Sequence, residues 1–172
     1  MTTNDGTYRF ERRQFIARPL ADVFAFFSEA GNLEKITPPS LKFRILTPLP
    51  IVIEQGKLID YRMSLFGLPF CWQTLIERFE PPSCFSDVQA RGPYKFWRHT
   101  HEFCAQDGGT LMIDRVEYQL RLGPIGWLAN VLFVRRQLDQ IFDFRCRTIA
   151  ELLSESRTND SPAAAVAPQS VT

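Results

Sequence analysis

Two histidines and one aspartate stand at spacings that could bring their side chains together on one β-hairpin. His99 and His101 are two residues apart, and Asp114 follows them beyond an Asp-Gly-Gly sequence at 107–109. Glycine favours the tight turn of a hairpin because it adopts positive φ without a steric penalty. Imidazole and carboxylate groups that meet in an apolar interior can orient a polar ligand group or transfer a proton. The pattern therefore predicts a candidate site, though not yet a function.

The hairpin would extend over residues 92–123, because both flanks of the glycine turn alternate between apolar and polar residues. A two-residue loop places odd positions before the turn on the same face as even positions after it. A loop at 107–108 puts His101 directly opposite Asp114, whereas a loop at 108–109 keeps the same face but shifts each pair. A three-residue loop would turn the histidines outward unless a bulge compensates. The expected inward residues are Trp97, His99, His101, Phe103, Met112, Asp114, Val116, Tyr118, Leu120 and Leu122.

The rest of the chain predicts one strand, two short helices, further strands and a long last helix. Pro19 suits the first turn of a helix, where its missing N–H costs nothing, and Gly31 suits the helix end. Asn32 can cap a second short helix before Pro38-Pro39. The expected elements are a strand at 7–16, helices at 18–31 and 33–37, strands at 41–46, 57–65, 70–78 and 84–91, the hairpin, and a helix at 126–153.

The strands at 57–65 and 70–78 form a second hairpin around Gly67. A turn at Gly67-Leu68 would bring the apolar residues of both strands to one face, and the agreement of two alternations supports that register. The residues on this face are Ile59, Tyr61, Met63, Leu65, Phe70, Trp72, Thr74 and Ile76.

The strand at 84–91 can face the interior in two ways. A three-residue loop at 92–94 would place Asp87 beside His99, and we prefer this arrangement. The two alternative inward sets are Phe85, Asp87 and Gln89, or Cys84, Ser86 and Val88.

Composition indicates one domain with a sizeable core. The chain has 172 residues, of which 45% are hydrophobic and 15 are Phe, and its net charge of +1 gives no reason to expect a nucleic-acid partner. Its four cysteines show neither a CxxC pair nor metal-ligand spacing, so we expect reduced thiols. The start of the chain lacks an apolar targeting segment, and no apolar run is long enough to span a membrane. We therefore expect a cytoplasmic protein.

Four segments of the chain resemble the SRPBCC superfamily of START-like, helix-grip proteins. They are RPLADVFAFFSEAGNLEKITPP at 18–39, FSDVQARGPYKFWRHTHEF at 85–103, GGTLMIDRVEY at 108–118 and LGPIGWLA at 122–129. The last three look most like a bacterial ligand-binding branch that is similar to polyketide cyclase/dehydrase-type proteins, whose members occur alone or appended to sugar-nucleotide-epimerase-like proteins. The resemblance implies an α+β fold in which a curved, seven-stranded antiparallel sheet wraps around a long C-terminal helix. The domain would cover 7–153, with disordered ends at 1–6 and 154–172.

The resemblance also implies an apolar cavity between the sheet and the last helix. Such a cavity would bind a small, largely hydrophobic molecule, namely a lipid, isoprenoid, polyketide or aromatic metabolite. One alternative is a cyclase- or dehydrase-type enzyme in which His101, polarised by Asp114, acts as general acid/base. Another is a protein-interaction module. The expected ligand-binding residues are Tyr61, Met63, Trp72, Asp87, Gln89, Trp97, His99, His101, Asp114, Tyr118, Leu128, Leu132 and Arg135.

A metal ion is the remaining possibility for this face. Two histidines together with Asp114 could supply three ligands, as in other β-folds. The chain has no third histidine, Cys104 has the wrong parity for the inward face, and the superfamily is not typically metal-dependent. We therefore expect neither a metal nor another cofactor.

Overall fold

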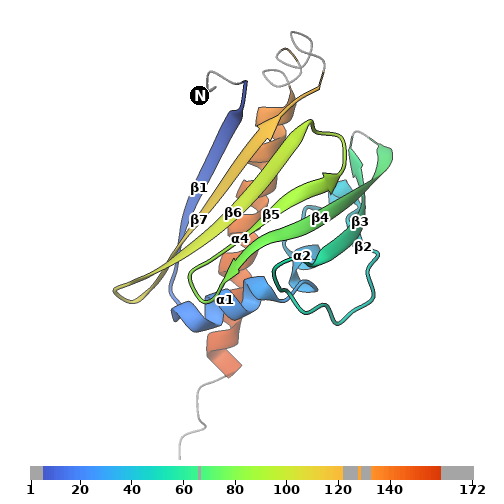
Figure 1. Cartoon of the computed structure of the whole chain (residues 1–172). Helices are drawn as coiled ribbons and strands as arrows, with labels where there is room; N and C mark the ends of the chain where they lie inside the picture. Colours follow the sequence, from blue (N-terminus) through green and yellow to red (C-terminus); the bar gives the residue numbers. More distant parts are fainter. Residues whose placement is uncertain (1–5, 66, 122–127, 129–132, 160–172) are drawn as a thin grey trace, which may run out of the picture.

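Seven antiparallel strands form one sheet in the computed structural model, which describes residues 6–65, 67–121, 128 and 133–159 (Figure 1). The order of strands across the sheet is β1-β7-β6-β5-β4-β3-β2. The strands are β1 (Tyr8–Ile16), β2 (Arg44–Ile45), β3 (Leu58–Leu65), β4 (Leu68–Glu80), β5 (Cys84–Arg91), β6 (Phe96–Gln106) and β7 (Gly109–Gln119), and the helices are α1 (Leu20–Ser28), α2 (Asn32–Lys35), the 3-10 helix η1 (Pro39–Leu41) and α4 (Arg135–Asn159).

The long helix α4 runs behind one face of the sheet, while α1 and α2 lie at one end of it (Figure 1). This is the helix-grip arrangement that the sequence predicted. From β1 the chain passes through two short helices to β2 at the opposite edge of the sheet. The strands then follow one another across the sheet until β7 pairs with β1. The candidate site lies on the face of the sheet that is turned toward α4.

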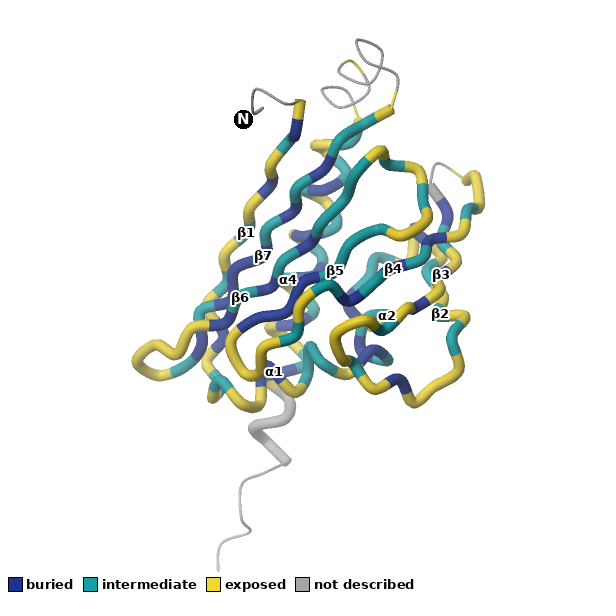
Figure 2. Tube along the Cα trace, viewed as in Figure 1, coloured by how far each residue is buried: buried dark blue, intermediate teal, exposed yellow. Residues whose placement is uncertain are grey.

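Buried and exposed residues alternate along the central strands, as expected for a sheet covered on one face (Figure 2). The core divides into three clusters. One packs α1 against β5, β6 and β7 around Phe24 and Phe103, and a second packs β1 and β7 against α4 around Phe10 and Phe142. The third joins β3 and β4 around Trp72. Together they fix the positions of the strands that surround the site.

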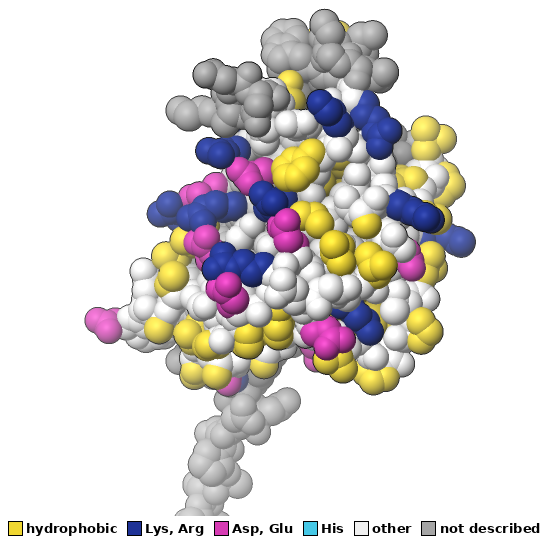
Figure 3. All heavy atoms as spheres, viewed as in Figure 1, with side chains coloured by type: hydrophobic (Ala, Val, Ile, Leu, Met, Phe, Trp, Pro, Cys, Tyr) yellow, Lys and Arg dark blue, Asp and Glu magenta, His cyan; other side chains and the backbone are white. Residues whose placement is uncertain are grey.

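The opposite face of the sheet carries basic and acidic side chains that are interleaved, and this can be followed over β1, β7 and β6 in Figure 3. Arg9 pairs with Glu117, Arg98 pairs with Glu77, and Arg115 contacts both Glu11 and Glu102. Such exposed pairs contribute roughly 0–1 kcal/mol each. They leave this face without a basic patch of the kind that binds nucleic acid, within the part of the chain that is described.

The register of the β6–β7 hairpin matches the version with a loop at 107–108. His101 pairs with Asp114 and Trp97 with Tyr118, while Gln106 pairs with Gly109 across the turn. Gly108 has φ of +78°, the conformation for which glycine was expected. The strand β5 follows the preferred arrangement, because Asp87 pairs with His99.

Three local predictions were wrong. In the β3–β4 hairpin Leu65 pairs with Leu68, and Tyr61 pairs with Trp72. The predicted turn at Gly67-Leu68 would have shifted each pairing partner by two residues. Such a shift keeps the same residues on the inward face. Gly31 has φ of −60° and precedes α2 instead of ending α1 in a left-handed turn. Asn32 lies inside α2, and its side-chain amide donates to the Phe26 carbonyl at 2.9 Å.

Several element ends also differ from the prediction. The strand β2 is short because Leu41 belongs to η1, and β4 extends at both ends beyond 70–78. Helix α4 continues to Asn159, past the predicted start of a disordered tail at residue 154. The predicted beginning of this helix at 126 lies outside the described residues, as do the chain ends at 1–5 and 160–172.

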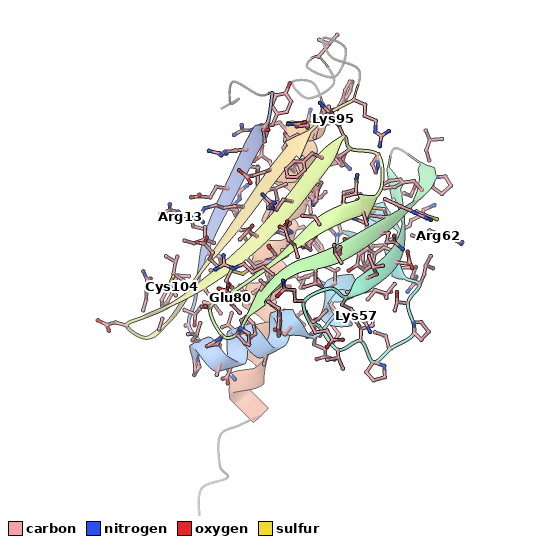
Figure 4. The ribbon with its side chains drawn as sticks, viewed as in Figure 1. Arg13, Lys57, Arg62, Glu80, Lys95 and Cys104 are labelled. Atoms are coloured by element: carbon pink, nitrogen blue, oxygen red, sulfur yellow. The ribbon has the colours of Figure 1, made fainter. Side chains whose placement is uncertain are left out.

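None of the described helices combines the length and apolar character that crossing a bilayer requires. The four cysteines are all free, as expected for reduced thiols. Cys104 is exposed and lies toward the turn end of β6 (Figure 4).

Replacing Gly109 with alanine should lower the free energy of unfolding by about 1–3 kcal/mol, because there is no space for its side chain. A Cβ at this position would stand 2.2 Å from the carbonyl oxygen of Ile16 and 2.8 Å from Phe15 Cζ. The obstructing oxygen belongs to the backbone at the end of β1 and cannot rotate away. Urea denaturation of both forms measures the difference.

Gly31→Ala is the matched control for this change. The nearest atom to its new Cβ would be Glu29 Oε1 at 3.8 Å, and its backbone is already helical. We expect little change in stability for this variant. Equal losses for the two variants would contradict the close approach of β1 to the hairpin turn.

Candidate functional site

A cavity of about 220 Å³ lies between the inner face of the sheet and α4, and the α1–α2 segment closes one side. Its lining is mainly apolar and aromatic, with polar side chains from β5, β6 and α4 and others, Glu29 among them, from the α1–α2 segment. The residues that supply the apolar surface include Phe26, Phe27, Leu33, Ile36, Phe43, Ile59, Tyr61, Met63, Trp72, Tyr94, Trp97, Leu138, Ile141 and Phe142. An apolar pocket with a few convergent polar groups is the usual form of a small-molecule site.

Four ionisable side chains from three elements meet on the polar part of the wall. Asp87 comes from β5, His99 and His101 from β6, and Arg145 from α4, and all four line the cavity. The pairing of Asp87 with His99 puts these two on the same face, and His101 follows two residues along. We call Asp87, His99, His101 and Arg145 the polar cluster.

Asp114 on β7 lies behind the two histidines and contacts both with a single oxygen. His99 Nε2 stands 3.0 Å from Asp114 Oδ1, and His101 Nδ1 stands 2.7 Å from the same atom. The His99 contact is a hydrogen bond. The His101 contact is short but is not a hydrogen bond, because the geometry at Nδ1 is unsuitable. All three side chains are buried. One carboxylate oxygen therefore hydrogen-bonds to the His99 ring and contacts the His101 ring.

Burial determines the protonation of His99. It lowers the pKa of His99 to about 3, with the neighbouring His101 adding to the effect and the Asp114 carboxylate opposing it. Burial alone would raise the pKa of Asp114, but its contacts with His101 and His99 outweigh burial and hold that pKa below its usual range. His99 is therefore neutral at pH 7 and donates its Nε2 proton to an ionised Asp114. Its other nitrogen, Nδ1, lies 4.0 Å from Asp87 Oδ1 and carries a free lone pair.

Asp87 titrates close to neutrality. Burial raises the pKa of its carboxyl to about 6, and Asp114 adds to the rise, while His101 and Arg145 oppose it. The Asp87 side chain is 18% exposed and lines the cavity. A carboxyl group with this pKa can accept or donate a proton near pH 6.

Arg145 supplies a buried positive charge on the α4 side. Its guanidinium carbon lies 5.1 Å from the centre of the Phe142 ring, a distance suited to a cation–π contact. Its Nε has no hydrogen-bond partner among the described residues. A buried N–H without a partner is costly, so this donor is available to a ligand acceptor.

Aromatic side chains form the wall of the cavity away from the polar cluster. Trp72 and Trp97 meet edge to face with ring centres 5.3 Å apart, and Tyr94 packs against both. The Trp72 indole N–H donates to Thr74 Oγ1 at 3.0 Å. Because this N–H is already bonded, the wall offers a ligand mainly apolar surface.

The structure brings seven of the predicted ligand-binding residues to the cavity and places the other described ones elsewhere. Those that line it are Tyr61, Met63, Asp87, Trp72, Trp97, His99 and His101. Asp114 and Tyr118 are buried beneath this surface, and Tyr118 packs on Tyr8 in the core beside α4. Arg135 and Leu128 are exposed, and Leu132 lies outside the described residues.

Gln89 has a structural position instead of a place on the cavity surface. Its Nε2 donates to the Tyr94 carbonyl at 3.0 Å, and its Oε1 accepts from the Tyr94 N–H at 3.2 Å. These two bonds hold the loop that carries Tyr94 into the cavity wall. Contact of Gln89 with a ligand stays a prediction, and the structure shows an indirect role for it through this loop.

Sequence reasoning missed Arg145 and chose Arg135 in its place. A usable signal was present, because Leu138, Phe142, Arg145 and Ile149 follow one another at helical spacing on a single buried stripe. The contribution of α1 and α2 had no such signal. Phe26, Phe27 and Leu33 read as ordinary core residues until the two helices are placed over the end of the sheet.

No protein-family profile and no curated protein matches the sequence. Solved structures do match. The protein Ms6760 from Mycobacterium smegmatis has a TM-score of 0.65 at 17% identity, over 91% of this chain and 96% of that chain. The di-domain ARO/CYC StfQ from the steffimycin biosynthetic pathway has a TM-score of 0.64 at 16% identity, over 90% of this chain and 53% of that chain.

A nucleoside-diphosphate sugar epimerase from Corynebacterium glutamicum is more similar in sequence. It is 29% identical, with a TM-score of 0.59, over 87% of this chain and 30% of that chain. This chain thus spans about a third of the epimerase. These neighbours confirm the helix-grip fold, in which a seven-stranded antiparallel sheet is combined with two short helices after β1 and a long C-terminal helix.

Proposed function

We propose that this protein binds a small, largely hydrophobic molecule that carries one or two polar groups, in the cavity between the sheet and α4. The observation that carries the proposal is the contrast within one cavity wall. Aromatic and aliphatic side chains cover most of it, and the polar cluster occupies one part. Apolar burial would supply the affinity, and the polar cluster would fix the orientation of the ligand. In this proposal the protein acts in the cytoplasm.

The volume of the cavity favours a compact ligand. About 220 Å³ is below the roughly 300–1,000 Å³ of typical drug-sized sites, so an aromatic or short polyketide-like molecule suits it better than a long acyl chain. The free Nε–H of Arg145 and the lone pair on His99 Nδ1 offer one donor and one acceptor. A phenol hydroxyl at the end of an aromatic ring system would satisfy both groups, because it can accept from Arg145 and donate to His99.

A matched pair of probes tests the proposal, with naphthol carrying one hydroxyl and naphthalene none. Isothermal titration in the presence of EDTA should detect tighter binding of naphthol. His99→Gln keeps an N–H near Asp114 and removes the Nδ1 acceptor, so it should weaken naphthol binding about tenfold and leave naphthalene unchanged.

Filling the cavity provides the second arm of this test. Ile141→Phe should reduce binding of both probes, because Ile141 lines the cavity. Gln140→Phe is the control on the exposed side of the same helix and should bind as the wild type does. Native mass spectrometry of protein from its own cells should also show a retained small molecule. An empty protein that ignores both probes and captures a defined macromolecule would favour an interaction module instead.

A second candidate function is acid/base catalysis on an enolisable carbonyl compound. It is supported by the 2.7 Å approach of His101 Nδ1 to Asp114, which leaves Nε2 as the nitrogen available to a substrate in the cavity. The likeness to a di-domain ARO/CYC protein also favours it. His101→Asn should then abolish turnover of a polyketide-like carbonyl substrate while binding persists. If no member of a carbonyl panel is turned over by the wild type, this candidate fails.

A further inference from the structure

The three residues Asp87, His99 and His101 have a property that binding of an organic ligand does not require. One ligand atom from each of them lies within 4.8 Å of the other two. All three line the cavity, and both histidines are buried. Two imidazoles and one carboxylate are a common ligand set for Zn²⁺ and Fe²⁺ sites that keep coordination positions open for substrate.

The ring nitrogens are oriented as metal binding would require. Asp114 Oδ1 contacts Nε2 of His99 and Nδ1 of His101. The other ring nitrogens, His99 Nδ1 and His101 Nε2, are therefore free to bind a metal. Histidines that bind metals usually donate their other N–H to a carboxylate, which fixes the tautomer and the ring direction. Asp114 forms this hydrogen bond with His99, and its Oδ1 stands 2.7 Å from His101 Nδ1. The sequence suggested Asp114 itself as a ligand, but its place behind the rings makes it the supporting carboxylate and leaves Asp87 as the ligand.

The balance of buried charge also leaves room for a cation. Asp87 and Asp114 are two buried or nearly buried carboxyl groups, and Arg145 is the single guanidinium on the described cavity wall. The nearby Arg12 is engaged with Asp139 and Asp143 on α4, at 3.3 and 2.9 Å. Two carboxyl groups beside one arginine therefore leave a position where a bound cation would offset negative charge in an apolar interior.

We propose that Asp87, His99 and His101 form a three-ligand site for a divalent transition-metal ion, with Asp114 orienting both histidines and the open coordination positions facing the cavity. The ligand atoms of a tetrahedral site with bonds of about 2.0–2.2 Å are roughly 3.3–3.6 Å apart. Asp87 Oδ1 is 4.0 Å from His99 Nδ1, so metal binding would draw these two ligand atoms closer together. This site goes beyond the proposed ligand binding and does not depend on it.

Cobalt titration of the untagged full-length protein tests the site, because Co²⁺ reports the type of its ligands in its visible spectrum. We expect one Co²⁺ per chain, displaced by Zn²⁺, and a spectrum without a thiolate charge-transfer band. His99→Gln and His101→Asn each keep an N–H for Asp114 and remove the metal-binding nitrogen. These two variants and Asp87→Ala should each weaken Co²⁺ binding about 100-fold, and Asp114→Asn about 10–100-fold.

Two controls separate this site from adventitious binding. Glu29→Gln removes another carboxylate of the cavity wall, and the double change Cys71→Ser/Cys104→Ser removes the exposed thiols. Both should bind Co²⁺ as the wild type does. Circular dichroism shows whether each variant is folded, and a Zn²⁺-soaked crystal of the wild type should place the anomalous peak among Asp87, His99 and His101 independently of any variant.

Three results would each overturn the site: folded wild type that binds no Co²⁺, binding that survives His99→Gln and His101→Asn, or an anomalous peak elsewhere. Because naphthol binding is measured with EDTA, loss of the metal site leaves the proposed ligand binding intact. Conversely, a protein that binds Co²⁺ but no organic probe would reject the proposed function and keep the metal site.

Discussion

Replacing Asp114 with alanine is expected to lower the free energy of unfolding by about 1–3 kcal/mol, the loss typical of leaving a buried donor without its hydrogen-bond partner. The carboxylate is 4% exposed and is the acceptor for His99 Nε2 at 3.0 Å. Without it, the buried N–H of His99 loses its partner, the His101 ring loses its contact, and a small cavity forms between them. Urea denaturation at pH 7 measures the loss.

Two other substitutions separate this effect from the general cost of changing a strand aspartate. Asp114→Asn keeps an oxygen acceptor of the same shape, so it should lose less than the alanine variant. Asp60→Ala removes an exposed aspartate on β3, whose carboxylate accepts from Gln73 at 3.0 Å, and should change stability by less than about 1 kcal/mol. If Asp114→Ala cost no more than Asp60→Ala, the hydrogen-bonded cluster would contribute nothing to the fold.

The second large effect is an increase in stability, and it depends on pH. Asp87→Asn should raise the free energy of unfolding by up to about 3 kcal/mol at pH 8, because asparagine resembles the protonated carboxyl group that burial favours. The figure follows from a pKa raised from 3.8 to about 6, at about 1.4 kcal/mol for each pH unit. At pH 4 the advantage should nearly disappear.

The sign follows from proton binding. A carboxyl group whose pKa is higher in the folded state holds its proton there after the unfolded chain has lost it. The stability that Asp87 contributes is therefore complete below about pH 4 and is lost as the pH rises through 6. His99 acts in the opposite direction: its lowered pKa contributes stability above pH 6.5 that is lost as the pH falls toward 3.

These opposing contributions predict different pH profiles for the two proteins. In the wild type the gain from Asp87 offsets part of the loss from His99 between about pH 6 and 4. In Asp87→Asn this offset is gone, so stability should fall steadily as the pH drops below 6.5. Urea denaturation across pH 4–8 in the presence of EDTA measures both profiles. Parallel profiles for the two proteins would show that Asp87 is not held in a buried environment.

The cluster is therefore arranged at a cost to stability. An apolar residue at Asp87 would avoid the burial of a charge, and no hydrogen bond of that side chain is found in the described part of the chain to offset it. Positions where a protein retains such a cost are commonly binding or catalytic sites. This physical argument supports a function at the polar cluster independently of the likeness to other folds.

The hairpin of β6 and β7 was predictable from sequence in detail. Its alternation extends over many residues on both sides of one glycine turn, and a slip of one residue would expose an entire apolar face. The meeting of His101 with Asp114 followed from that register alone. The position of Asp87 beside His99 followed less securely, because a loop of unknown length separates β5 from β6.

Local turns and helix ends were predicted less well. A shift of two in the β3–β4 pairing keeps the same residues inward, so alternation could not distinguish Tyr61 opposite Trp72 from its neighbours. Gly31 and Asn32 have the residue types of helix caps, but packing of the Asn32 amide on the Phe26 carbonyl decided their conformation. Residue preferences of this size, about 1 kcal/mol, yield easily to tertiary contacts.

The residue pattern determined that two histidines and an aspartate share the inner face of a sheet, because side chains of a strand alternate without exception over a regular stretch. It could not determine which groups meet them from other elements. Asp114 lies behind the imidazole rings, and Asp87 and Arg145 lie on the cavity side of them. This arrangement depends on how β5 and α4 are placed in space. These contacts join residues far apart in the chain, and their geometry is set by packing of the whole sheet on the helix, which local sequence does not encode.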